Sequence, residues 1–190
     1  AEEIESHDLQ VLDEVWKYGW DQEMGTVPAR RITDRAIRLS REEKPNRMIL
    51  HYMQPHFPSI PKPLAAGIDL DQFGEGWNSV WRRLKEGNLK SDKIWESYVM
   101  NLKYVLDDLE LLLENLAAEN VVISADHGNS FGKWGTYGHP PGIPTTELRK
   151  VPWVRTTARD TRSYQQEIVE ERNEVSEDTV ESRLEALGYK

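Results

Sequence analysis

The chain of 190 residues contains no cysteine, which excludes disulfides, thiolate zinc sites and cysteine nucleophiles. No apolar run approaches the roughly 20 residues that a membrane-spanning helix needs. Basic residues are in the minority, with 24 Lys and Arg against 33 Asp and Glu, so the formal net charge is −9. This balance argues against nucleic-acid binding and against attachment to anionic lipid, because both need clustered positive charge.

The remaining composition, 38% hydrophobic and 30% charged, is typical of a soluble globular chain, and the length suits a single domain. We expect one α/β domain over residues 1–158. A charged tail over 159–190 is expected either to contain a helix at 176–187 or to be partly disordered. The opening residues AEEIESHD have no leader pattern, which favours a cytoplasmic protein unless further residues precede Ala1.

Apolar residues recur at helical three- and four-residue steps in four stretches, 5–20, 29–42, 75–86 and 92–117. Three short apolar runs are typical of buried strands, 47–53, 120–126 and 151–156. The long helix 92–117 lies between two of these runs, which is the order of a parallel crossover. The sequence therefore predicts an α/β fold, a parallel-sheet core with flanking helices.

Candidate chemistry concentrates in the loops that follow the first two apolar runs. His56 follows the run 47–53, Asp126 ends the run 120–126 and His127 comes directly after it, and His139 lies further along the Gly- and Pro-rich loop 127–150. The loops after parallel strands come out at one edge of a sheet. We therefore expect these four side chains to lie near one another. The other two histidines are interpreted as structural or solvated, His51 and His7.

Asp126, His127 and Gly128 form the sharpest local pattern. A carboxylate beside an imidazole suits Zn, Mn or Mg, and a carboxylate with oxygen partners suits Ca. An Asp that caps a turn beside a surface His explains the same residues. His56 and His139 are likewise open to two interpretations, a ligand-binding group or a turn histidine packed on its neighbours.

Three segments, in one order, resemble the alkaline phosphatase and sulfatase superfamily, and the sulfatase-like proteins most of all. The first is HYMQPHFPSIP, with a Pro-His-x-Pro core. The second is the helical stretch YVMNLKYVLDDLELLLENL. The third is VVISADHGNSFGKWGTYGHPPGIPTTELRKVPWV, which contains Asp-His-Gly and a later Val-Pro strand. The resemblance covers about residues 45–156 and corresponds to the C-terminal half of such enzymes.

The resemblance implies a metal-dependent hydrolase whose substrate is an anionic sulfate or phosphate ester. Asp126 and His127 match the metal-binding pair, and the implied cofactor is a divalent metal, Ca, Mg, Mn or Zn. His56 and His139 match histidines that contact the substrate or its oxyanion, so they are the implied catalytic residues. Two basic residues just before the Val-Pro strand match substrate-binding positions more loosely, Arg149 and Lys150. Lys133 is interpreted as ordinary surface charge.

The chain also departs from the family pattern. The family nucleophile follows an N-terminal strand that ends in metal-binding acids, whereas this chain opens with predicted helices. Gln54 stands where phosphatases have an acid, which favours a one-metal site. Residues 26–30, TVPAR, fit the sulfatase signature superficially, but Thr26 cannot become formylglycine, so we interpret them as a helix start.

Two hypotheses follow for the whole chain. It is an incomplete C-terminal portion of a hydrolase that lacks the usual nucleophile region, or it is a catalytically inactive homologue that acts as a binding or regulatory subunit. Both leave a sheet edge open. We expect that edge to be covered by a homo-oligomeric contact or by a missing N-terminal half.

Overall fold

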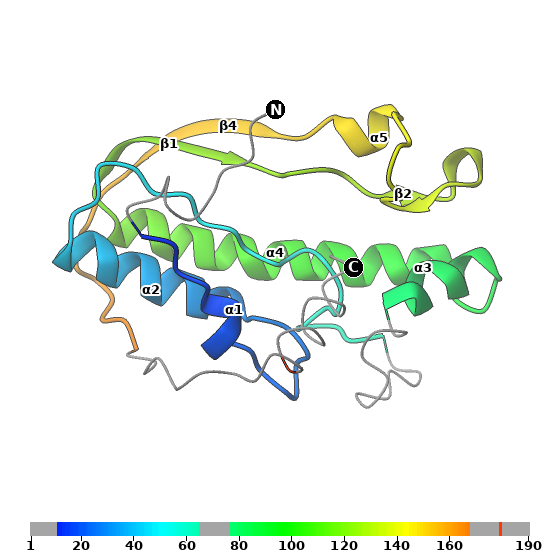
Figure 1. Ribbon diagram of the computed structural model, residues 1–190, viewed down its shortest axis with the longest axis horizontal. Helices are drawn as coiled ribbons and strands as arrows, with labels where there is room; N and C mark the ends of the chain where they lie inside the picture. The colour runs from blue at the N-terminus through cyan, green and yellow to red at the C-terminus, as the bar shows by residue number, and fades with distance from the viewer. Residues whose placement is uncertain (1–10, 65–76, 168–178, 180–190) are drawn as a thin grey trace.

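The computed structural model describes residues 11–64, 77–167 and 179. Its helices are α1 (Val15–Tyr18), α2 (Ala29–Glu42), α3 (Trp77–Lys85), α4 (Ser91–Asn115) and α5 (Thr146–Arg149), with a short 3-10 turn, η3 (Lys133–Gly135). Its strands are β1 (Ala118–Ser124), β2 (Ser130–Phe131), β3 (Tyr137–Gly138) and β4 (Trp153–Ala158). Figure 1 shows α2 on one side of α4 and the ribbon of β1 and β4 on the other.

The long helix α4 was predicted, but its buried face is not the most apolar one. Trp95, Leu102 and Leu106 remain 55%, 38% and 46% exposed. The buried stripe mixes apolar and polar residues, Ile94, Ser97, Asn101, Val105, Asp108, Leu112 and Asn115. The polar members are buried because they bind other segments. Asp108, for example, accepts a hydrogen bond from Arg30 Nε at 2.6 Å.

Two apolar clusters hold the elements together. The first joins α2 to the end of α4 through Ala36, Ile37, Leu112 and Leu116. The second joins the loop after residue 55 to α3 and α4 through Phe57, Val80, Leu84 and Ile94. Partly buried aromatic rings extend the second cluster toward the hairpin of β2 and β3, and Trp81 meets Phe131 edge to face at 5.1 Å. This hairpin leads directly to His139.

The predicted fold, α/β with a parallel-sheet core and flanking helices, is wrong. The described residues form a mixed α/β structure with two small antiparallel sheets, β1 with β4 and β2 with β3. In the first sheet Val122 lies opposite Arg155 and Ser124 opposite Trp153. The loop after β1 returns the chain alongside β1, so β4 pairs with that strand where the prediction placed residues 47–53.

The predicted first strand, residues 47–53, is extended but unpaired. Among the described residues no hydrogen bond reaches the backbone of residues 47–52. Its side chains nevertheless alternate as in a strand. Met48 and Leu50 pack on the first apolar cluster, whereas Ile49 between them is 89% exposed.

Residues 47–53 and β1 run in the same direction, from left to right in Figure 1. Met48 and Leu50 pack on the same helical cluster as Ala118, at the start of β1. The loops that follow the two segments therefore emerge at the same end of the molecule. The direction predicted from the crossover is right, although the hydrogen-bonded ladder between the segments is missing.

The other predicted elements fare as follows. The helix at 29–42 is confirmed with the same bounds, and the predicted runs 120–126 and 151–156 correspond to β1 and β4. Of the predicted helix 5–20, residues 1–10 lie outside the described residues, and only Val15–Tyr18 is helical beyond them. The predicted helix 176–187 lies outside the described residues except for residue 179. No helix in the described part of the chain has the length and apolarity to cross a membrane.

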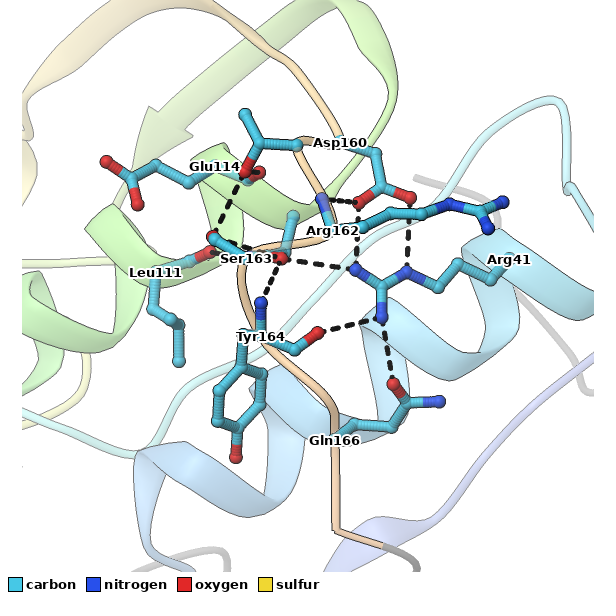
Figure 2. A network of polar contacts seen from close by, with 10 residues as sticks. Arg41, Leu111, Glu114, Asp160, Arg162, Ser163, Tyr164 and Gln166 are labelled. Atoms are coloured by element: carbon cyan, nitrogen blue, oxygen red, sulfur yellow. Dashed lines mark hydrogen bonds and ion pairs between the residues drawn. The ribbon is translucent and has the colours of Figure 1, made fainter.

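The segment after β4 lies on α2 and α4 as far as residue 167. Arg41 of α2 forms an ion pair with Asp160, with Nη2 2.8 Å from Oδ1, and donates to the Tyr164 carbonyl at 3.0 Å (Figure 2). Asn115, at the end of α4, accepts from the Tyr164 N–H at 3.0 Å. The first part of the predicted tail is therefore hydrogen-bonded to α2 and α4. The division of the chain into a domain and a tail at residue 158 stays a prediction.

Candidate functional site

Three imidazoles from distant parts of the chain lie together beside one carboxylate. The ring centroids of His127 and His139 are 4.1 Å apart, and those of His139 and His56 are 5.6 Å apart. Asp126 Oδ2 is 3.5 Å from His127 Nε2. We call these four residues the histidine cluster. The predicted proximity of these side chains is confirmed, even though the parallel sheet invoked to explain it is absent.

Two of the rings are held in a defined tautomer. His56 Nδ1 is 3.0 Å from its neighbour's carbonyl, Phe57 O, and His127 Nδ1 is 3.1 Å from Gly128 O. A carbonyl oxygen only accepts, so Nδ1 carries the proton in both rings. Such anchoring of Nδ1 on a backbone carbonyl is usual for histidines that bind metal or accept protons through Nε2.

Burial within the cluster increases from Asp126 toward His56. The side chain of Asp126 is 64% exposed and that of His127 is 37% exposed. Burial lowers the pKa of His56 to about 3, and charge on the neighbouring His139 acts in the same direction. Burial also lowers the pKa of His139, with charge on His127 as the second cause. His56 and His139 are consequently neutral at pH 7.

Two glycines let the backbone approach closely enough to place the rings. A Cβ on Gly128 would lie 2.0 Å from the carbonyl oxygen of Glu147 in α5. The Gly128 N–H also donates to Leu148 O at 2.9 Å. Gly138, with φ +67°, leaves room for the ring of Trp81, which a Cβ would approach to 3.0 Å. These contacts fix the residues next to His127 and His139.

Two packed aromatic side chains, Tyr98 and Phe131, lie next to the histidine cluster, and the sequence alone did not identify them as part of a site. Tyr98 packs against Phe131 with ring centroids 5.7 Å apart, and its hydroxyl accepts a hydrogen bond from Asn129 Nδ2 at 3.3 Å. Burial raises the pKa of Tyr98, and the negative charge of Asp126 adds to the effect. The sequence gives little indication of the hydrogen bond between Asn129 and Tyr98. The only indication is that Asn129 directly follows Asp-His-Gly.

The three basic residues near the loop differ from one another in their contacts within the described part of the chain: Lys133 is ion-paired, whereas Arg149 and Lys150 are not. Lys133 forms an ion pair with Glu147 of α5, so its charge is already compensated. Arg149 and Lys150, at the end of α5, are exposed. Within the described ranges neither makes an ion pair or a side-chain hydrogen bond. Their predicted substrate contact stays a prediction.

Residues 26–30, which superficially fit the sulfatase signature, lead into α2 and include its first two residues. Thr26 is 2% exposed, and Gln54 Nε2 donates to Val27 O at 2.9 Å. Arg30 is engaged by Asp108, and the helix begins at Ala29. The interpretation of this stretch as a helix start is confirmed.

The donor chemistry of Asp126 and His127 suits a divalent ion, but two side chains do not complete a site. Across residues 11–64, 77–167 and 179, no three His, Asp or Glu side chains are grouped so that they could hold a metal ion. A bound ion would need a further ligand from outside the described residues. Metal binding therefore stays a prediction.

Comparison with known proteins identifies no relative, because no family model, no curated protein and no solved structure matches the chain.

Proposed function

We propose that the histidine cluster is part of the active site of a sulfatase-like hydrolase of sulfate or phosphate esters, and that this chain supplies the portion without the usual nucleophile. The observation that supports the proposal is the convergence of three imidazoles and Asp126 from separate loops. Titratable groups that are partly desolvated and grouped in this way are typical of functional sites.

The chemistry of the four residues suits hydrolysis of an ester. His139, a neutral imidazole whose ring centroid lies 4.1 Å from that of His127, can accept the proton of an attacking water molecule, and His56 lies beside it to contact the anionic ester. The water oxygen forms a new bond to sulfur or phosphorus while the bond to the ester oxygen breaks, and the departing alkoxide takes the proton back from the imidazolium and leaves as the alcohol. Asp126 Oδ2, 3.5 Å from His127 Nε2, adds a negative charge beside the cluster that favours the imidazolium formed on His139.

The resemblance implies that a divalent metal takes part. Asp126 and His127 would be two of its ligands, and the ion would stabilise charge on the anionic ester. Because the described residues offer only this pair, we derive no step through the ion.

The proposal is tested with a panel of aryl sulfates and aryl phosphates, assayed with and without Ca, Mg, Mn and Zn. His139→Gln should reduce turnover at least a hundredfold, the range expected when a general base is removed. His127→Gln should reduce turnover as well, because it removes one of the two implied metal ligands. His51→Gln is the matched control, because His51 is an exposed histidine outside the cluster. A folded chain that binds no metal and turns over no ester would contradict catalysis by this chain alone.

A second candidate is a catalytically inactive binding or regulatory subunit. The unpaired backbone of residues 47–52 and the exposed Ile49 favour it, because an unpaired strand is a template for pairing with another chain. This function predicts a persistent partner or a homodimer. Sedimentation analysis that finds a monodisperse monomer at high concentration would count against it.

A further inference from the structure

The loop that carries His56 is fixed to α4 by a buried amide. Asn101 is 0% exposed. Its Nδ2 donates to the carbonyl of His56 at 2.9 Å and to that of Pro58 at 3.5 Å, and its Oδ1 accepts from the Ile60 N–H at 3.2 Å. One side chain therefore satisfies three backbone groups of a loop whose prolines cannot form regular structure.

Ser97, one helical turn before Asn101, holds the next part of the same loop. Its Oγ donates to Lys62 O at 2.7 Å, and its carbonyl accepts from Ser59 Oγ at 3.1 Å. Ser97 is also 0% exposed. Residues 56–62 are thus attached to a rigid helix at several points, and the first of these points is the backbone of His56.

We propose that Asn101 is a positioning residue for His56, with Ser97 in a supporting role. The significance of this placement rests on the proposed function, in which His56 contacts the substrate. Asn101 holds the His56 carbonyl, and the next carbonyl along the chain, Phe57 O, fixes the Nδ1–H tautomer of the His56 ring. The amide thereby fixes the backbone from which the His56 ring extends, directly before the carbonyl that sets the tautomer of the ring.

The substitution that isolates this role is Asn101→Asp, which keeps nearly the same shape. It retains an acceptor for Ile60 but places carboxylate oxygen against the carbonyls of His56 and Pro58, where the native amide donates. The matched control is Asn115→Asp. Asn115 is the other fully buried asparagine of α4 and binds the segment after β4 at the far end of the helix.

Two measurements separate positioning from stability. The first is the imidazole ¹H–¹⁵N spectrum of His56, assigned by its loss in His56→Gln, which reports the tautomer. The second is the affinity for inorganic sulfate, followed by the same resonances. In Asn101→Asp we expect the Nδ1–H signature of His56 to be lost and sulfate to bind about tenfold more weakly, as for other supporting contacts of a site. Asn115→Asp should change neither.

An unchanged His56 spectrum in Asn101→Asp overturns the proposal, and so does an equal change in Asn115→Asp. If Asn101→Asp does not fold, Ser97→Ala provides the milder variant, since it removes only the bond to Lys62 O. It should broaden or shift the His56 resonances without altering those of His51, and unchanged His56 resonances would again overturn the proposal. If the wild-type protein binds no sulfate, the proposed function fails, whereas the His56 spectrum still decides the positioning role.

Discussion

The side chains of this molecule are buried to different degrees in two layers. The helical layer consists of α2 and α4, and the strand layer consists of β1, β4 and the extended residues 47–53. In the helical layer, Ile37 and Ile94 are fully buried and the buried polar residues Asn101 and Asn115 are hydrogen-bonded. In the strand layer, Ile49 is 89% exposed, Trp153 65% and Val122 48%. A helix satisfies its own backbone, whereas a strand depends on neighbours, so an incomplete environment affects the strands first.

The largest expected effect contrasts two isoleucines from these layers. Ile37→Ala should lower the free energy of unfolding by about 2–5 kcal/mol, because it leaves a cavity in the cluster between α2 and α4. Ile49→Ala should lower it by less than about 0.5 kcal/mol in a monomer. Urea denaturation followed by circular dichroism measures both. Equal losses would show that the two layers do not differ as described.

The second prediction concerns the approach of the Asp126–His127 segment to α5. Gly128→Ala should destabilise the protein by about 1–3 kcal/mol, because the new Cβ would lie 2.0 Å from Glu147 O and the backbone must move. Gly142→Ala is the control, since a Cβ there meets nothing within 4 Å and only the left-handed φ of +76° is strained. Thermal unfolding should rank Gly128→Ala as the more damaging change. A reversed order would contradict the close packing against α5.

The third prediction is a pH dependence that originates in the histidine cluster. The pKa of His56 is about 3 in the folded protein, against 6.5 for an unperturbed histidine. Its contribution to stability is therefore complete above pH 6.5 and is lost as the pH falls from 6.5 toward 3. The expected slope is about 0.7 kcal/mol per pH unit at pH 6.5, where the unfolded His56 is half protonated, and approaches about 1.4 kcal/mol per pH unit below about pH 5.5.

Urea denaturation between pH 7 and pH 5 measures this slope. Comparison with His56→Gln isolates the contribution of His56 from that of His139, whose pKa is lowered in the same direction. A wild-type slope no steeper than that of the variant would mean that His56 titrates as an exposed histidine.

The comparison of the two layers also explains what the sequence could and could not predict. The bounds of α2 follow from local spacing and from Pro28 before it, and local information sufficed. The pairing of β1 was misassigned because alternation indicates a strand but does not name its neighbour. Residues 47–53 illustrate this point, since they have the side-chain alternation of a strand without its ladder.

The histidine cluster was predicted for a reason that is only half right. The direction of residues 47–53 relative to β1 brings His56 to Asp126, and that direction follows from the helix between them. The hydrogen bonds between the His56 loop and α4 could not be predicted from the sequence. Helical periodicity favours Leu102 and Leu106 as buried residues, whereas the buried residue that binds the loop is Asn101. Hydrogen bonds to a distant loop leave no periodic signal.

The smallest expected effect on stability comes from a substitution at Ile49, and it distinguishes an exposed segment 47–53 in a monomer from one that is paired with another chain. Ile49→Thr keeps β-propensity and should leave the stability of a monomer unchanged within about 0.5 kcal/mol. If another chain covers residues 47–53, the substitution should instead weaken self-association or partner binding. Sedimentation velocity at increasing protein concentration distinguishes the two cases.

The central claim is that His56, His127 and His139 form one group at the end of the strand layer. Nuclear Overhauser contacts between the assigned imidazole protons test it most directly. We expect cross-peaks from His139 to both His127 and His56, in accord with ring separations of 4.1 and 5.6 Å, and none from the exposed His51. A folded protein in which His56 shows no contact to His139 would contradict the cluster and the function proposed for it.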